Sequence, residues 1–409
     1  MRVLLLSHYY PPEVGAPQRR WSALVPHLRN RGVRVNVITT PPHYPHGYVR
    51  AEHAVLRPGA RSAGAWGEVV HRVRYLPYDK TVRTRGLDQI IAAVDTVRVG
   101  LTRFSRHRPD VIVATAPSLP TVLAGAVLGR LLGVPVVVEM RDAWPDLISY
   151  RRQWQDDESS VLTSVLATAA HHVVTWAQRR ATALVTTSEA FAQRLRDRGM
   201  PPVHVIRTGT NQQQVSARID HDGPLRILYL GTVGRSQDLA TAVRAAALLR
   251  QQGVGGQMRI VGDGALRPEV RALADQLQAP VTFLDPVSPA ETATQYTWAD
   301  TVLVSLRPWE PMAWTVPSKL LEVIGTGRHV TGALAGEPAQ ILTDAGAGHV
   351  VPSGNVEALA GLWRTLEQDR SLLDVGDSGA QWLATHAREE DLAERYLSLL
   401  QHVTTTARR

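Results

Sequence analysis

The sequence contains no cysteine, and only two of its 409 residues are lysine. The absence of cysteine excludes disulfide bonds, thiolate catalysis and cysteine-ligated metal centres. Because Lys80 and Lys319 are the only lysines, almost all of the positive charge comes from arginine, and the formal net charge is +8. A net charge of this sign and size favours an anionic binding partner.

Long hydrophobic runs are also missing. The most apolar stretch, residues 111–138, is broken by prolines and by Arg130, whereas a membrane-spanning helix needs about 20 consecutive apolar residues. The N-terminal segment 1–15 has no small-residue cleavage site and is typical of a buried strand rather than a signal peptide. We therefore expect a cytoplasmic protein, and we leave open a peripheral contact with the inner face of the plasma membrane.

Motifs of several binding classes are absent as well. No RNP, helix-turn-helix or zinc-finger pattern accompanies the arginines, so we expect no nucleic-acid partner. The chain has no full GxGxxG fingerprint and no P-loop, which disfavours a nicotinamide oxidoreductase. The arginine excess falls mostly in the first half of the chain. Either an anionic partner surface, such as lipid headgroups, or a solvated arginine-rich surface explains it.

Short β-branched runs alternate with longer amphipathic segments, and this alternation predicts an α/β fold with parallel sheets covered by helices on both faces. The pattern ends near residue 208 and then restarts. We expect one domain at 1–208, to which a last helix at 388–405 returns, and a second at 209–387. The predicted strands are 2–7, 34–40, 68–76, 111–115, 135–140, 183–188 and 203–207, then 226–234, 257–264, 281–287, 301–306, 329–334 and 348–352.

Three loops that follow predicted strands carry glycine near the start of a helix. Parallel sheets bind ligands at the carboxyl ends of their strands, so these loops are candidate binding sites. In the loop 8–20, Gly15 and Ala16 allow a close approach of a ligand to the backbone, although an ordinary strand-to-helix turn is the alternative that we favour for this loop alone. The loops of the second half supply the candidates Gly231, Gly234, Gly262, Asp263 and Gly264.

The segment TVPSKLLE (315–322) predicts a helix that opens with a cation and carries an anion one turn later. Pro317 fits the first turn, where no amide donor is lost. The amides of Ser318 and Lys319, with the lysine charge, suit a diphosphate. Glu322 lies about 7 Å further along the axis, close to the step from a diphosphate to its ribose, whose hydroxyls a carboxylate accepts. A surface ion pair between Lys319 and Glu322 is the alternative.

Charged residues also follow the predicted strand at 135–140. Arg141 and Asp142 are candidates for contact with an acceptor or a transferred sugar, and a helix cap is the alternative for Asp142. A paired-carboxylate glycosidase is the rival chemistry, with Asp142 and Asp146 as its acids. Pro145 between the two disfavours the regular helix that would align them.

Two histidines, His43 and His46, follow the second predicted strand and are candidates for the acceptor side. Their spacing of three residues raises the possibility of a metal site. We expect no metal there, because no third ligand is near and the surrounding prolines predict an irregular loop.

The segment 90–108 is amphipathic, with arginines beside apolar residues such as Ile90 and Ile91. Packing on the sheet and a position in a membrane interface both explain its apolar stripe. We favour packing, with the basic rim of the helix available to lipid.

Six motifs follow one another along the chain: RVLLLSHYYPPEVGAPQRR (2–20), MRDAWPDL (140–147), YLGTVGRSQDL (229–239), RIVGDG (259–264), PSKLLEV (317–323) and GEPAQIL (336–342). Together they resemble the GT4 glycosyltransferases of GT-B fold, nearest to the capsular and O-antigen branch. The resemblance implies two Rossmann-like domains with parallel sheets facing across a cleft, and a C-terminal helix that crosses back to the N-terminal domain.

The resemblance also implies roles. The N-terminal domain would bind the acceptor and the C-terminal domain the nucleotide sugar, with retention at the anomeric carbon and no required metal. Glu322 would contact the donor ribose, with Ser318 and Lys319 near the phosphates and Gly15 and Ala16 facing the donor.

The chain departs from the family pattern at three positions. The first glutamate of the usual EX7E pair falls on Trp314, and the usual arginine and lysine of the phosphate loop fall on Thr232 and Gln237. Arg235 is our candidate replacement for the lost charge. These departures leave the identity and positioning of the transferred sugar open.

We predict a retaining hexosyl- or N-acetylhexosaminyltransferase that uses a nucleotide sugar, with UDP as the first hypothesis, and no cofactor. Because the leaving diphosphate gains negative charge, Lys319 and Arg235 are predicted to act catalytically with Glu322 and Asp142. A lipid-linked saccharide of polysaccharide or glycoconjugate biosynthesis is the first acceptor hypothesis, and a small natural product is the second. A nucleotide-sugar binding protein that has lost catalysis, suggested by Trp314, is the alternative of another class.

Overall fold

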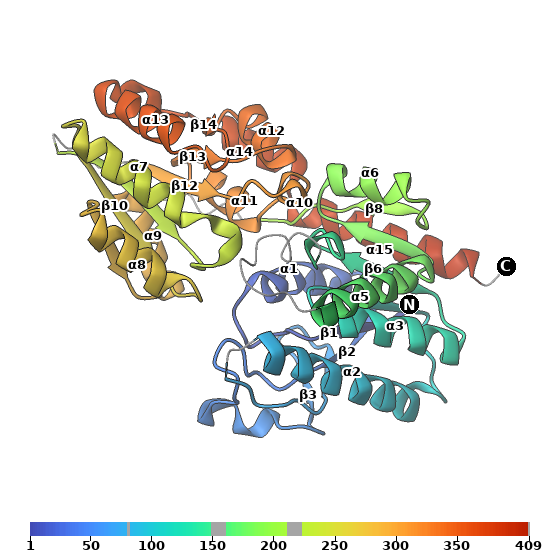
Figure 1. Cartoon of the computed structure of the whole chain (residues 1–409). Coiled ribbons are helices and arrows are strands. Elements are labelled where there is room, and N and C mark those ends of the chain that lie inside the picture. Colours follow the sequence, from blue (N-terminus) through green and yellow to red (C-terminus); the bar gives the residue numbers. More distant parts are fainter. Residues whose placement is uncertain (80–81, 149–160, 211–222, 408–409) are drawn as a thin grey trace. The chain divides into compact units, whose positions relative to one another are not determined.

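The computed structural model describes residues 1–79, 82–148, 161–210 and 223–407. The chain divides into two compact units, Met1–Gly209 with Glu389–Arg409, and Thr210–Arg388. Figure 1 shows that each unit has its own sheet with helices around it. Residues 211–222, which follow the predicted boundary between the two halves, lie outside the described residues. None of the described helices is long and apolar enough to cross a membrane.

The sheet of the first unit has eight strands in the order β3-β4-β2-β1-β5-β6-β7-β8. All neighbours are parallel except β3, which runs antiparallel to β4 at the edge. The strand β3 was not predicted, because three residues are too few for an alternation to be recognised. The strands are β1 (Arg2–Ser7), β2 (Arg34–Thr39), β3 (Arg61–Ala63), β4 (Val69–Arg72), β5 (Val111–Thr115), β6 (Val136–Met140), β7 (Ala183–Thr186) and β8 (Val203–Val205).

Helices cover both faces of this sheet. The helices are α1 (Ala16–Asn30), α2 (Val82–Phe104), α3 (Leu119–Leu132), α5 (Val161–Arg179), α6 (Glu189–Asp197) and α15 (Glu389–Thr406), with the 3-10 helix η1 (Ala51–Leu56). Side chains of β1 alternate between the two faces, as a strand requires. Val3 and Leu5 pack with α1 and α15, whereas Leu6 faces Gly125 of α3. Both faces are apolar because both are buried.

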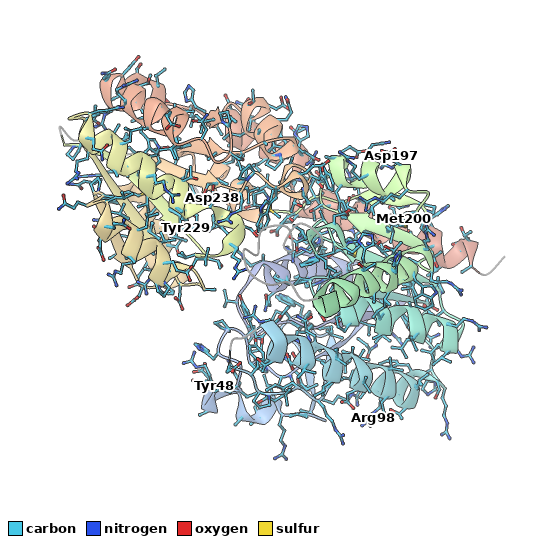
Figure 2. All side chains as sticks on the ribbon, viewed as in Figure 1. Tyr48, Arg98, Asp197, Met200, Tyr229 and Asp238 are labelled. Carbon is cyan, nitrogen blue, oxygen red and sulfur yellow. The ribbon has the colours of Figure 1, made fainter. Side chains whose placement is uncertain are left out.

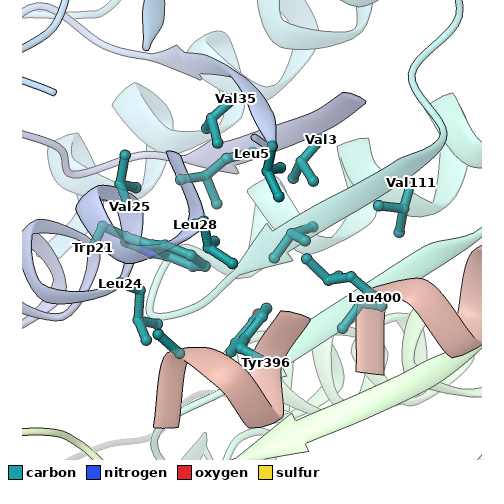
Figure 3. Packing of buried hydrophobic residues seen from close by; sticks show 14 of the residues in the cluster. Val3, Leu5, Trp21, Leu24, Val25, Leu28, Val35, Val111, Tyr396 and Leu400 are labelled. Atoms are coloured by element: carbon teal, nitrogen blue, oxygen red, sulfur yellow. The ribbon is translucent and has the colours of Figure 1, made fainter. Parts of the chain in front are cut away.

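The last helix, α15, completes the core of the first unit, as Figure 3 shows. Tyr396 of α15 lies edge-on to Trp21 of α1, with ring centroids 5.8 Å apart, and Leu400 packs beside them. Each of these side chains is almost fully buried, and such burial contributes about 1.5–3 kcal/mol per side chain. The predicted return of the last helix to the first domain is therefore confirmed.

One arginine of the basic first half is an internal structural residue. The side chains of Arg20 and Glu139 form a buried ion pair at 3.0 Å between α1 and β6. The same guanidinium donates to the carbonyl oxygens of Ile206 and Arg207, so each of its nitrogens has an acceptor. A buried charge is tolerated when it is paired in this way.

The second unit has six parallel strands in the order β11-β10-β9-β12-β13-β14. Its strands are β9 (Leu225–Leu230), β10 (Gly256–Val261), β11 (Val281–Leu284), β12 (Thr301–Ser305), β13 (His329–Ala333) and β14 (Gly348–Val351). Its helices are α7 (Leu239–Gln251), α8 (Arg267–Gln276), α9 (Pro289–Trp298), α10 (Glu310–Ala313), α11 (Ser318–Ile324), α12 (Glu337–Asp344), α13 (Val356–Gln368) and α14 (Ser378–His386), with the 3-10 helices η2 (Arg235–Gln237) and η3 (Arg370–Leu373). The strand order reverses between β9 and β12, the place where open parallel sheets bind ligands.

Candidate active site

The loops after β9 and β12 are joined at the point where the strand order reverses. Ser305, the last residue of β12, donates its hydroxyl to the carbonyl oxygen of Gln237. The backbone amide of Arg307 donates to Ser236 at 2.8 Å, and its guanidinium lies 3.6 Å from the carboxylate of Asp238. Figure 2 labels Asp238 and Tyr229 beside this loop. The loop that contains η2 is therefore held against the carboxyl end of β12.

Two of the glycines predicted in the second unit, Gly262 and Gly264, are required by contact between two loops. Gly231 and Gly262 have φ values of 152° and 141°, which L side chains rarely adopt. A Cβ on Gly262 would lie 2.0 Å from the carbonyl oxygen of Gly231, and one on Gly264 would lie 2.3 Å from that of Val233. The loops after β9 and β10 thus pack backbone against backbone.

The helix α11 brings the predicted cation and anion to this edge. A Cβ on Gly231 would lie 3.6 Å from Cε of Lys319, so the lysine side chain passes over the glycine turn. Nζ of Lys319 lies 3.2 Å from Oε1 of Glu322, and the hydroxyl of Tyr296 donates to the same oxygen at 3.0 Å. Pro317 occupies the cap position, one residue before the first turn that the sequence analysis assigned to it.

The ion pair that was the alternative interpretation is therefore present. It is a partly buried pair: the side chains of Lys319 and Glu322 are 22% and 25% exposed. Tyr296 fixes the carboxylate from a second element, α9, and is itself 2% exposed. The contact with the buried Tyr296 distinguishes this pair from an ion pair between fully exposed side chains. We name Gly231, Tyr296, Lys319 and Glu322 the lysine–glutamate cluster.

Arg235 and Trp314 lie near this cluster in sequence but differ in burial. Arg235 is exposed on η2, and its catalytic role stays a prediction. Trp314 follows α10 and is 8% exposed, so the indole takes a packed position where the resemblance leads us to expect a carboxylate. Asp263 is exposed, and its carbonyl oxygen accepts from the amide of Val233.

The carboxyl edge of the sheet in the first unit carries a buried polar network. Nε2 of His8, directly after β1, and Nε2 of His43, after β2, lie 3.1 and 3.0 Å from Oδ2 of Asp88 on α2. Nδ1 of His43 contacts the carbonyl oxygen of Pro41 at 2.8 Å. The amide of Leu76 donates to the other oxygen of Asp88 at 2.9 Å. One carboxylate thus holds two loops against a helix.

The network is charged despite its burial. Burial acts to lower the pKa of His43, but the hydrogen bond and charge of Asp88 outweigh it, so the pKa lies above its ordinary value. Burial acts in the opposite sense on Asp88, and the hydrogen bonds from His43 and His8 hold the pKa of that carboxyl well below its usual range. Each partner therefore stabilises the ionised form of the other.

These three side chains also form the one group in the described chain whose geometry could hold a metal ion. Hydrogen bonding accounts for each of the close contacts that Asp88 makes. The pair His43 and His46, considered in the sequence analysis, is separated by the fold: His43 is 1% exposed, while His46 is exposed beside Tyr48. The placement of His46 at the acceptor side stays a prediction.

A second carboxylate connects the same two loops. Oε1 of Glu13 accepts from the backbone amides of His43 and Tyr44, both at 2.8 Å, and Oε2 accepts from Gln18 of α1 at 2.9 Å. Gly15 is the residue before α1 and has an extended backbone. A Cβ on it would meet the end of the flexible Gln18 side chain, so the fold alone does not require glycine there. The predicted approach of Gly15 and Ala16 to a donor stays a prediction.

The segment after β6 places Arg141 and Asp142 side by side. Burial lowers the pKa of the Arg141 guanidinium and raises that of the Asp142 carboxyl, against the opposing charge of Arg141. Asp146 forms a two-pronged ion pair with Arg198, with both hydrogen bonds at 2.7 Å. Asp146 is thus committed to a structural contact, and the glycosidase alternative loses its second acid.

Two family models match the chain in succession. A glycosyl transferase 4-like domain matches residues 15–209, and the model of glycosyl transferases group 1 matches residues 224–369. The chain belongs to the GT4 glycosyltransferases.

Named relatives of this glycosyltransferase occur among polysaccharide enzymes. It is 24% identical over 293 residues to WcaI of Escherichia coli, a glycosyl transferase provisionally named for colanic acid biosynthesis, and the match covers 68% of this chain and 69% of WcaI. It is 26% identical over 192 residues to the amylovoran biosynthesis glycosyltransferase AmsK of Erwinia amylovora, covering 45% and 47% of the two chains.

Solved structures of the same fold cover nearly the whole glycosyltransferase. Sucrose-phosphate synthase from Thermosynechococcus elongatus superposes with a TM-score of 0.77 at 17% identity, covering 99% of both chains. Anabaena HepE in complex with UDP-glucose gives 0.68 at 14% identity, covering 98% of this chain and all of HepE. The predicted GT-B fold is confirmed.

Several residues of the glycosyltransferase that carry these contacts were missed in the sequence, among them His8, Asp88, Tyr229 and Tyr296. The hydroxyl of Tyr229, near the end of β9, donates to the carbonyl oxygen of Thr232 at 2.6 Å and so shapes the glycine turn. His8 could have been found, because it is the first residue after a predicted strand. Asp88 and Tyr296 lie within helices, and no local pattern marks them.

Proposed function

We propose that this glycosyltransferase moves a sugar, with retention of anomeric configuration, from a UDP-sugar held by the second unit to an acceptor bound by the first. The observation that supports the donor site is the lysine–glutamate cluster at the carboxyl ends of β9 and β12. It combines a cation, a supported carboxylate and a glycine turn within one partly buried group.

The chemistry of the cluster suits a nucleoside diphosphate. Lys319 would turn from Glu322 to the diphosphate, whose negative charge grows as the bond to the anomeric carbon breaks. Glu322, still held by Tyr296, would accept the two hydroxyls of the ribose. Before the nucleotide binds, the ion pair therefore keeps the side chains of Lys319 and Glu322 at the site where the diphosphate and the ribose would bind.

Anomeric retention and the nature of the acceptor are proposed from the resemblance to the family and from the names of relatives. WcaI and AmsK are named for the biosynthesis of colanic acid and of amylovoran, which favours a saccharide acceptor. We propose a lipid-linked saccharide at the inner face of the plasma membrane. Asp142, a carboxyl whose pKa burial raises above its ordinary value, is the candidate for contact with the acceptor or the transferred sugar.

The test of the donor site is the variant Glu322→Ala. Loss of charged hydrogen bonds to the ribose should weaken transition-state binding by about 2–4 kcal/mol, which is about 30- to 1000-fold in kcat/KM. A nucleotide-sugar screen by thermal shift supplies the substrate, and analysis of the anomeric configuration of the product tests retention. The matched control, Glu269→Ala, changes an exposed glutamate of α8. Unchanged transfer by Glu322→Ala would remove the assignment.

A binding protein without turnover is the second candidate, and Trp314 is the observation that favours it. The packed indole occupies the position of the first glutamate of the family pair. A UDP-sugar that raises the unfolding temperature while no product forms, from any acceptor or by hydrolysis, would support this candidate. Transfer by the wild-type protein would reject it.

A further inference from the structure

Three tyrosines and one arginine of the first unit come together near the buried network at Asp88. Tyr9 follows β1, and Tyr44 lies in the loop after β2. Tyr78 lies between β4 and α2, and Arg85 stands near the start of α2. The rings of Tyr9 and Tyr44 have centroids 5.3 Å apart. The Arg85 guanidinium lies 5.8 Å from the ring centroid of Tyr44 and 5.5 Å from that of Tyr78. We name these four residues the tyrosine–arginine cluster.

Backbone contacts hold the loops of the cluster in place. The amide of Tyr44 donates to the carboxylate of Glu13 at 2.8 Å, and the amide of Tyr78 donates to the carbonyl oxygen of Gly47 at 3.0 Å. Gly47 has a φ of 84°, and a Cβ there would lie 2.0 Å from the carbonyl oxygen of Tyr78. The loop after β2 therefore packs backbone against backbone on the segment before α2, and the tyrosine rings have fixed positions.

The cluster contains polar atoms that the protein does not satisfy. Nε of Arg85 and the hydroxyl oxygen of Tyr78 are buried and have no hydrogen-bond partner among the described residues. Tyr78 is only 7% exposed. Within the described part of the chain, the guanidinium of Arg85 contacts tyrosine rings and pairs with no carboxylate. Because buried polar groups nearly always have a partner, these two atoms indicate a ligand.

The hydroxyl groups of the cluster are hydrogen-bond donors at neutral pH. Burial raises the pKa of Tyr78 to about 12, and burial also raises the pKa of Tyr9. The positive charge of Arg85 acts to lower both pKa values, but burial outweighs it. Both tyrosines are therefore protonated. A protonated hydroxyl near a guanidinium favours a ligand group with negative charge.

The charges around the cluster favour a carboxylate over a phosphate or a diphosphate. One guanidinium supplies a single positive charge, and its planar fork matches the two oxygens of a carboxylate. The charges of Asp88 and Glu13 also act on Tyr78, and they would repel a group with more than one negative charge. The tyrosine rings add apolar faces on which the C–H groups of a sugar can pack.

We propose that the tyrosine–arginine cluster binds the carboxylate of an acidic sugar residue in the acceptor, with the Arg85 guanidinium and the Tyr78 hydroxyl as its donors. Parallel sheets bind ligands at the carboxyl ends of their strands, and the cluster follows three such ends, those of β1, β2 and β4. A neutral saccharide would leave both donors unpaired and bind less well. The inference rests on the proposed function for the role of this ligand as the acceptor, and it names the class of saccharide.

The test is binding of methyl β-D-glucuronide to the full-length protein, measured by ligand-observed NMR without any sugar donor. Methyl β-D-glucoside is the matched neutral ligand, because it differs only in a hydroxymethyl group that replaces the carboxylate. We expect the glucuronide to bind about tenfold or more tightly than the glucoside, since the neutral sugar lacks the charged hydrogen bonds.

A pair of arginine variants locates the carboxylate. Arg85→Gln keeps a polar side chain without the charge, and it should remove the preference for the glucuronide. Arg106→Gln is the control, because it changes an exposed arginine just beyond the end of α2. This control should keep the preference of the wild type.

The variant Tyr78→Phe separates a binding role from a packing role. Removal of a buried hydroxyl that has no partner should leave the free protein equally stable or more stable in urea. The same change should weaken glucuronide binding about tenfold, because one hydrogen bond to the carboxylate is lost. A hydroxyl with a purely structural role would not produce this combination.

Three results would overturn the proposal. The first is failure of the glucuronide to bind the wild type more tightly than the glucoside does. The second is an unchanged preference in Arg85→Gln, which would place the carboxylate elsewhere. The third is tighter binding of glucose 6-phosphate than of the glucuronide, lost in Arg85→Gln, which would make the cluster a phosphate site. Binding is measured without transfer, so this proposal and the proposed function can fail separately.

Discussion

Replacement of Asp88 by asparagine tests the buried network of the first unit. The carboxylate receives three hydrogen bonds, from His8, His43 and the amide of Leu76. Asparagine has nearly the same shape and can still accept from Leu76, but it has no charge to pair with protonated His43. Removal of one partner from a buried ion pair costs about 3–5 kcal/mol. We expect a loss of that size at pH 6.

The pH dependence follows from the pKa directions of the two partners. The pKa of folded His43 lies above that of the unfolded chain, about 6.5, so its contribution is complete below pH 6.5 and is lost as pH rises through the folded value. The pKa of folded Asp88 lies below its unfolded value, so its contribution disappears only in acid. The difference between wild type and Asp88→Asn should therefore be larger at pH 6 than at about pH 9.

The measurement is urea unfolding of the full chain, followed by hydrogen exchange in peptides of β1 and β2 so that the first unit is observed alone. Asp275→Asn, at an exposed residue of α8, is the control for the chemical change. A loss below about 1 kcal/mol at pH 6 would refute the argument, because that is the size of an exposed pair. Equal losses at both pH values would refute the ionised state of His43.

Two further predictions concern the second unit. Gly262→Ala should destabilise the second unit by about 3 kcal/mol or more, since the new Cβ would lie 2.0 Å from the carbonyl oxygen of Gly231 in a backbone conformation that L side chains rarely adopt. The control is Gly361→Ala on α13, where the new Cβ meets nothing within 4 Å. This control should be neutral or stabilising by about 0.5–1 kcal/mol, and urea unfolding compares the two variants. Burial and the nearby His349 lower the pKa of His329 to about 3, so protons bind the unfolded chain first and stability should fall below pH 6.5 by about 1.4 kcal/mol per pH unit. His329→Asn should flatten that slope in acid titrations of unfolding, and an unchanged slope would contradict it.

Local patterns predicted the start of α11 and the placement of Lys319 and Glu322 on it. The segment 317–323 contains both the start of α11 and the charged residues Lys319 and Glu322 that the helix orients. Their relative positions could therefore be predicted from consecutive residues alone. The glycines at 231 and 262 were found for a similar reason, since each directly follows a strand. Their required backbone contact was not visible, because it joins two loops that are distant along the chain.

The network at Asp88 could not be predicted, because its members meet only in the folded sheet. His8 and Asp88 are 80 residues apart in sequence, and an aspartate inside an amphipathic helix gives no local sign of burial. The parallel sheet brings the ends of β1 and β2 to one edge, and α2 then presents the carboxylate to both. Predicting such contacts requires knowledge of the strand order as well as of the hydrophobic pattern along the sequence.

The expectation that Ile90 and Ile91 of α2 pack on the sheet is wrong, because both side chains are exposed, and the error has a physical cause. Periodicity shows that a helix has an apolar stripe, but not which side faces the protein. Here α2 packs so closely on α3 that Gly100 lies against Leu128, and small residues such as Ala92 and Ala93 fill that side. Leu87, Ile90, Ile91 and Val94 are left exposed.

The position of α15 in the core of the first unit has a consequence for biosynthesis. Residues 1–209 leave the ribosome long before Tyr396, with the entire second unit translated in between. Until then the pocket that Tyr396 fills beside Trp21 is open, so the nascent N-terminal segment exposes an apolar surface that chaperones recognise. Expression of that segment by itself should yield aggregated material, and co-expression of a peptide spanning 389–407 should rescue it.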